Sequence, residues 1–101
     1  MSTERGVQLI VVASTAAAFA EEIAVRLRRN GSLVYVTHSL QGCLRVATSV
    51  GPDVVLLDPA LPQRERLEQL LNAHPISARA TVLRLAGDTL PHPAPQVLHA
   101  A

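Results

Sequence analysis

A short apolar run at positions 7–13, Val-Gln-Leu-Ile-Val-Val-Ala, constrains the fold more than any other feature of this sequence. Its β-branched residues and near lack of polar ones are typical of a strand covered on both faces, as in a parallel sheet. A second such run occupies residues 53–58, and shorter strand-like segments occupy residues 32–37 and 81–86. The pattern therefore predicts a buried sheet of at least four strands.

Helical periodicity separates the first two of these segments. Three large apolar residues recur every four positions: Phe19, Ile23 and Leu27. This spacing predicts an amphipathic helix with one face on the sheet. Ser14 and Thr15 precede it and belong to the residue types that cap helix N-termini. Asn30-Gly31 follows it and favours a left-handed C-terminal cap.

Two more helices are predicted by the same reasoning. The first is capped by Ser39 and stopped by Gly51-Pro52, and three of its residues share a face: Leu40, Leu44 and Ala47. The second covers residues 64–73, with three leucines directed inward: Leu67, Leu70 and Leu71. Strand and helix thus alternate, which predicts an α/β fold with right-handed crossovers. We expect a flavodoxin-like open parallel sheet of four or five strands, with three helices in a three-layer αβα arrangement.

The length of 101 residues is sufficient for a single domain, which we expect to span residues 1–101. Apolar residues make up 49% of the chain and aromatic residues only 2%, so the core must be built from aliphatic side chains. Residues 86–101 differ in character, because Pro91, Pro93 and Pro95 exclude a regular helix. We expect an abbreviated, proline-rich tail, in which a short fifth strand at residues 96–99 stays open.

The charge balance gives no electrostatic reason to expect nucleic acid or a membrane surface as a partner, since the formal net charge is +1. A single cysteine, Cys43, excludes an internal disulfide and favours a reducing, cytoplasmic setting. It lies on a predicted inward helix face and is interpreted as a core residue. The alternative of a secretory signal rests on Ala18-Phe19-Ala20, which resembles a signal-peptidase site, but Glu4 offsets Arg5 ahead of the apolar stretch.

Functional residues of an open parallel sheet lie beyond the carboxyl ends of its strands. Seven residues occupy such positions: Ala13, Ser14, Thr15, Asp58, Ala86, Gly87 and Asp88. They contain no glycine-rich phosphate loop, so a nucleotide is not expected. The four histidines lack the spacing of metal ligands: His38, His74, His92 and His99. The charge run of Arg26, Arg28 and Arg29 is interpreted as a solvated helix end.

The segment 51–62, Gly-Pro-Asp-Val-Val-Leu-Leu-Asp-Pro-Ala-Leu-Pro, resembles the third strand of response-regulator receiver domains. In that family an aspartate in the place of Asp58 accepts a phosphoryl group, and a proline follows four residues later. The resemblance extends through residues 39–44 and 72–85 and spans residues 7–87. It implies a receiver domain that is degenerate and C-terminally shortened.

Several residues depart from the family pattern. The family's acidic pair at the end of strand one, which holds Mg²⁺, is replaced by Ala13 and Ser14. The hydroxyl residue at the end of strand four is replaced by Ala86. A lysine that contacts the phosphoryl group has no counterpart, because all nine basic residues are arginines. Asp58 is therefore either a loop cap that accepts backbone N–H groups or a phosphoacceptor.

Three functional hypotheses follow. The first is a receiver-like signalling or adaptor module that binds a protein partner independently of phosphorylation and has neither catalytic residues nor a cofactor. Because shortening would uncover apolar surface on the fourth strand and beside the first helix, that partner could be a second copy, as a homodimer. The second keeps Asp58 as a phosphoacceptor, with Mg²⁺ as cofactor and a histidine kinase as partner. The third is a small hydrolase or ligand-binding domain that uses Ser14 to hold an anion.

Overall fold

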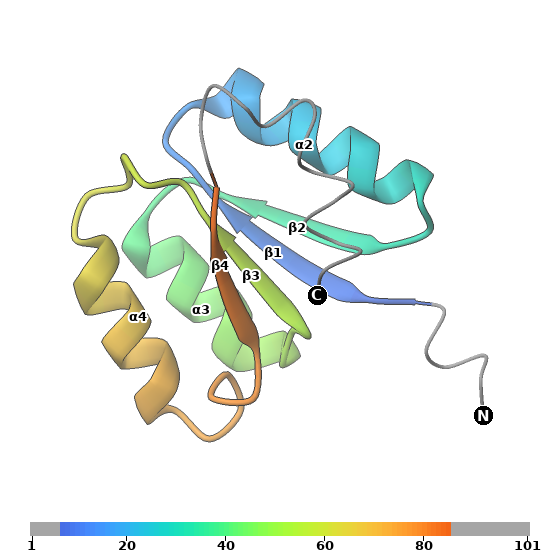
Figure 1. The fold of residues 1–101 in the computed structure, drawn as a ribbon. Helices are drawn as coiled ribbons and strands as arrows, with labels where there is room; N and C mark the ends of the chain where they lie inside the picture. Colours follow the sequence, from blue (N-terminus) through green and yellow to red (C-terminus); the bar gives the residue numbers. More distant parts are fainter. Residues whose placement is uncertain (1–6, 86–101) are drawn as a thin grey trace.

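Within residues 7–85, four parallel strands form one sheet in the order β2-β1-β3-β4 (Figure 1). The computed structural model describes residues 7–85 and gives the strands these bounds: β1 (Leu9–Ala13), β2 (Leu33–Thr37), β3 (Val54–Leu57) and β4 (Thr81–Arg84). The predicted parallel sheet is confirmed. The tail at 86–101, with its possible strand at 96–99, lies outside the described residues.

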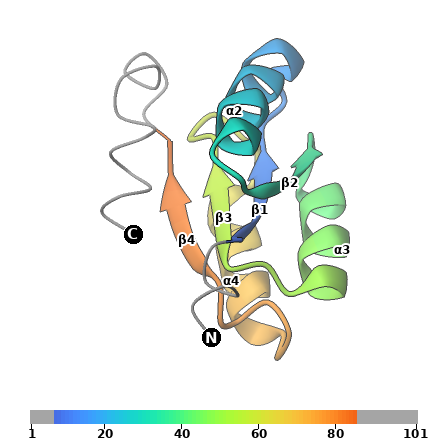
Figure 2. The ribbon, with the colours of Figure 1, turned by 90° about the vertical axis from the view of Figure 1, so that its right-hand side faces the viewer.

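In the described part of the chain, three helices cover the two faces of the sheet: α2 (Ala17–Arg29), α3 (Leu40–Val50) and α4 (Arg64–Ala73). Figures 1 and 2 show α2 on one face and both α3 and α4 on the other. Within residues 7–85, β1, β2 and β3 are each followed by a helix that leads to the next parallel strand. This is the three-layer αβα arrangement that the sequence predicts.

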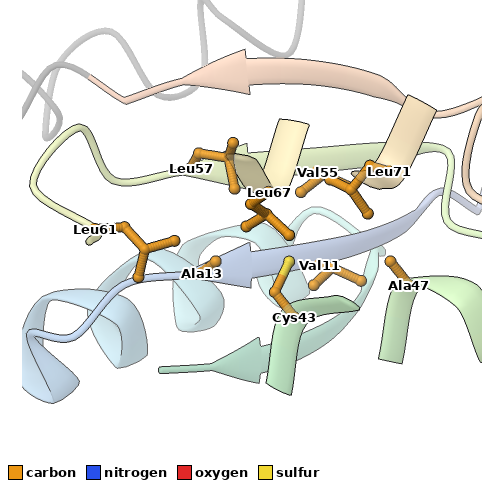
Figure 3. Close-up of a cluster of buried hydrophobic side chains, with 9 residues drawn as sticks. All are labelled: Val11, Ala13, Cys43, Ala47, Val55, Leu57, Leu61, Leu67 and Leu71. Carbon is orange, nitrogen blue, oxygen red and sulfur yellow. The ribbon is translucent and has the colours of Figure 1, made fainter. Parts of the chain in front are cut away.

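The two central strands are buried on both faces. Successive side chains of a strand point in opposite directions, so Ile10 and Val12 pack towards α2 while Val11 and Ala13 pack towards α3 and α4. All four are fully buried. Figure 3 shows the second of these clusters, in which Cys43 lies among aliphatic side chains. Burial on both faces explains why the sequence run contains so few polar residues.

The helix ends agree with the sequence in three of four cases, and one of them is Gly31, which follows α2 with a positive φ of 91°. The Ser39 hydroxyl accepts a hydrogen bond from the Gly42 amide at 3.0 Å, and Gly51 ends α3 with a positive φ of 63°. The prediction that Ser14 or Thr15 caps the first helix is wrong. The N-cap is Ala16, whose side chain has no oxygen to accept a hydrogen bond. The Ser14 hydroxyl lies two residues earlier and donates to the Asp58 carboxylate. Leu70, predicted to point inward, is only half-buried.

Strand β2 forms an edge of the sheet within the described residues. Two apolar residues of β2 are exposed there: Leu33 leaves 58% of its surface exposed and Tyr35 leaves 44%. The sequence predicts exposed apolar surface on the fourth strand, whereas these two residues lie at the opposite edge of the sheet. Arg28 of α2 reaches this edge and donates from Nη2 to the Val34 carbonyl oxygen at 2.9 Å. None of the helices within residues 7–85 is both long and apolar enough to cross a membrane.

Candidate functional site

Asp58 lies directly after β3, and both of its carboxylate oxygens are hydrogen-bonded within the protein. Oδ2 accepts a hydrogen bond from the Ser14 hydroxyl at 2.7 Å, and Oδ1 accepts one from the Ala60 amide at 2.9 Å. Only 9% of the residue is exposed. The carboxylate therefore joins the end of β1 to the loop after β3.

Ser14 is the main partner of this carboxylate. Strands β1 and β3 are neighbours, so their carboxyl ends meet, and the Asp58 amide donates to the Ala13 carbonyl oxygen at 3.0 Å. Ser14 is fully buried, and its hydroxyl also accepts a hydrogen bond from the Ala16 amide at 3.1 Å. The Ala13 side chain packs in the cluster with Cys43 and offers no polar group. Of the positions compared with the family, Asp58 thus supplies one carboxylate and Ser14 one hydroxyl, and we call this pair, with the Ala60 amide, the Asp58 pocket.

The anion-holding role considered for Ser14 is not supported by this geometry. The Ser14 amide donates to the Thr37 carbonyl oxygen at 3.0 Å, and the Ala16 amide is used by the Ser14 hydroxyl. These two amides are not directed to a ligand. The buried Ser14 hydroxyl donates to a carboxylate, rather than to a histidine that could act as a base.

His38 follows β2 and contacts the same corner of the molecule. Its Nδ1 lies 2.9 Å from the Ser14 carbonyl oxygen. Because a carbonyl oxygen can only accept, Nδ1 is the donor in this contact. His74 instead accepts a hydrogen bond from the Ile76 amide at 3.2 Å. His92 and His99 lie outside the described residues, and residues 7–85 contain no cluster of three or more side chains suited to a metal ion.

Cys43 and Asp53 occupy structural positions, and for Cys43 this is the core position that the sequence predicts. Cys43 is buried, and burial raises the pKa of its thiol to about 11, an effect partly offset by a side-chain hydrogen bond with Thr37. Asp53 lies at the opposite end of the sheet from Asp58. Its Oδ2 accepts a hydrogen bond from the Leu9 amide at 2.8 Å, which ties the start of β3 to the start of β1.

A groove of about 440 Å³ opens beside this corner, where α3 and α4 begin, and we call it the α3–α4 groove. Its polar lining includes His38, Gln41, Gln63 and Arg66, and its apolar lining includes Leu40, Pro62 and Leu70. None of the described residues that line it is acidic. Sequence reasoning missed this groove, because its residues come from three separate segments of the chain and form no motif.

Two solved structures share the fold of this chain. The response regulator from Desulfuromonas acetoxidans superposes with a TM-score of 0.70 and 18% identity, covering 93% of this chain and 78% of that chain. The receiver domain from the hybrid histidine kinase CckA superposes with a TM-score of 0.65 and 18% identity, covering 89% of this chain and 98% of that chain. No family model and no curated protein matches the sequence. The chain therefore has the receiver-domain fold that the segment at 51–62 suggests.

Proposed function

We propose that this chain is a receiver-like signalling module that acts by binding another protein, independently of phosphorylation at Asp58. The observation that carries the proposal is the pair of hydrogen bonds to the Asp58 carboxylate, from the Ser14 hydroxyl and the Ala60 amide. A carboxylate that caps a loop in this way has a structural task of its own. Likeness to receiver domains supports the signalling part of the proposal.

The residues around Asp58 do not fit the Mg²⁺ ion that the resemblance implies. A hard cation is bound by oxygen ligands, and carboxylates supply the charge that holds it. Ala13 offers no oxygen from its side chain, and the Ser14 hydroxyl carries no charge while its oxygen already accepts a hydrogen bond from the Ala16 amide. Phosphoryl transfer relies on a metal ion to neutralise the developing charge, so the proposal assigns this pocket no phosphoryl transfer.

The test is an amide NMR titration with Mg²⁺ and beryllofluoride, a mimic of the phosphoryl group. We expect the spectra of the wild type and of Asp58→Asn to respond alike, without shifts centred on the end of β3. The control is a receiver domain with an intact acidic pair, which must respond under the same conditions. Shifts around Asp58 that appear only in the wild type would overturn the proposal.

A second candidate function is phosphotransfer to Asp58 from a histidine kinase. It is favoured by the place of Asp58 directly after β3, with Pro62 four residues later, in a chain with the receiver fold. It requires the carboxylate to exchange the Ser14 hydroxyl for a metal ion. The same titration separates the two candidates, because only phosphotransfer predicts a response that depends on Asp58.

Self-association is the simplest form of the proposed partner binding. The edge strand β2 exposes Leu33 and Tyr35, and burying such side chains against a second copy would remove apolar surface from water. Light scattering over a range of protein concentrations tests this. We expect the apparent mass to rise towards that of a dimer, and to do so less in Tyr35→Ser. A constant monomer mass would restrict the proposal to other protein partners.

A further inference from the structure

We propose that the α3–α4 groove binds an acidic side chain of a partner protein. This inference rests on the proposed function and deepens it, since it names both the surface and the chemistry of the partner. It depends on three observations: the charge of the lining, the shape of the lining, and the hydrogen bond that fixes His38 at one end.

The lining is electrostatically one-sided. Arg66 is exposed on α4, and it forms no ion pair or hydrogen bond with any residue in 7–85. Two other arginines are engaged, Arg84 with Glu68 and Arg28 with the Val34 carbonyl oxygen. A guanidinium without a partner in residues 7–85, in a groove lined by no acidic residue of that range, is complementary to a carboxylate.

The shape of the groove favours one side chain with apolar neighbours. Its volume of about 440 Å³ is within the usual range for sites that hold small groups. Leu40 and Leu70 contribute apolar surface on either side, one from α3 and one from α4. A glutamate flanked by leucines could therefore place its carboxylate at Arg66 and its neighbours against these side chains.

His38 fixes the polar end of the groove. Its Nδ1–H is held by the Ser14 carbonyl oxygen, so the ring is oriented and Nε2 is the nitrogen left for other contacts. The same Ser14 bonds to Asp58 through its hydroxyl. Hydrogen bonds through Ser14 thus join His38, which lines the groove, to Asp58, which does not line it.

The experiment is an amide NMR titration of the complete chain with two blocked tripeptides, Leu-Glu-Leu and Leu-Gln-Leu, each acetylated and amidated. We expect the glutamate peptide alone to shift amides in residues 38–41 and 63–70. Arg66→Gln should weaken this binding about tenfold, the loss expected for one charge-assisted hydrogen bond. Arg29→Gln, which removes an exposed arginine from α2 on the other face of the sheet, serves as the matched control and should bind as the wild type does.

Three outcomes would overturn the inference. The first is no shift at peptide concentrations up to about 10 mM, where a Kd of about 1 mM would still be visible. The second is an equal response to both peptides, and the third is unchanged binding in Arg66→Gln. Acetate, a free carboxylate, is a further probe: if it competes as well as the peptide, the site accepts small anions and a protein partner is not required. Failure of the proposed function itself is separate, because it appears as a beryllofluoride response that depends on Asp58.

Discussion

The Asp58 pocket and the α3–α4 groove lie at the same end of the sheet, yet their polar groups are used in opposite ways. In the pocket, the carboxylate is nearly buried and both of its oxygens bond to neighbouring segments of the chain. In the groove, Arg66 is exposed and has no partner within residues 7–85. Polar groups that satisfy one another stabilise the fold, whereas an exposed charge without a partner is available for binding. The difference locates the proposed activity in the groove.

The largest expected effect comes from introducing a second carboxylate into the Asp58 pocket. Ser14→Asp would place a buried negative charge against Asp58 and remove the hydroxyl that donates a hydrogen bond to the Asp58 carboxylate. An uncompensated buried charge should lower the free energy of unfolding by about 3–5 kcal/mol at neutral pH. Because Mg²⁺ would neutralise this charge, we expect added Mg²⁺ to raise the Tm of this variant.

Ser14→Asn is the matched control for that change, because it alters the same position without adding charge. Its Tm should not depend on Mg²⁺, and neither should that of the wild type. Thermal unfolding followed by circular dichroism, with and without Mg²⁺, measures all three proteins. A wild-type Tm that rises with Mg²⁺ as much as the Ser14→Asp value would contradict the poor fit of Mg²⁺ to the residues around Asp58.

An intermediate effect on stability is expected when a side chain is removed from the Asp58 pocket rather than from the α3–α4 groove. Asp58→Ala leaves the Ser14 hydroxyl and the Ala60 amide without their acceptor, which should cost about 1–3 kcal/mol in the free energy of unfolding. Arg66→Gln removes no hydrogen bond or ion pair within residues 7–85 and should change the free energy of unfolding by less than about 0.5 kcal/mol. Urea denaturation measures both, and equal losses in the two variants would show that the regions do not differ in structural importance.

The smallest expected effect concerns the ion pair between Arg84 of β4 and Glu68 of α4, the helix that also carries Arg66. Arg84 donates to the Glu68 carboxylate from Nε and Nη2, each at 3.1 Å. This hydrogen bonding holds the pKa of Glu68 below its ordinary value. A carboxyl with a lowered pKa in the folded state contributes stability above its unfolded pKa. That contribution is lost as the pH falls through the lowered value.

Arg84→Gln should therefore be slightly less stable than the wild type at neutral pH, with the difference disappearing in acid once Glu68 is protonated. The effect is small because the Arg84 side chain leaves 57% of its surface exposed, so water screens the ion pair. Urea denaturation at several pH values measures it, and a difference that grows as the pH falls would have the wrong sign. Glu22→Gln is a control for the loss of an exposed ion pair elsewhere in the molecule, because Glu22 contacts Arg26 within α2.

The strands were predictable from the sequence because two of them are covered on both faces. Val11 and Val12 cannot meet water on either side, so the run at 7–13 contains almost no polar residues. The caps at Ser39 and Gly51 were predictable because each depends on local backbone geometry. Asp58 could be singled out for a similar reason, as the polar residue that ends a buried strand.

The rest depended on contacts between distant residues. Ser14 does not cap α2 because it meets a carboxylate 44 positions later in the chain, and no local pattern announces such a pair. Leu70 has the spacing of a core residue, yet it lies at the rim between α3 and α4 and remains half-buried. The groove escaped prediction for the same reason, since its residues become neighbours only after the helices pack.

The burial of Cys43 has a practical consequence for spectroscopy. With a pKa of about 11, its thiol is almost entirely protonated near neutral pH, and reagents that attack thiolates react with it slowly. It is the only cysteine in the chain. A fluorescent or spin label could therefore be attached at the mouth of the α3–α4 groove through Gln41→Cys while Cys43 stays in the core, and the label would report when the groove is occupied.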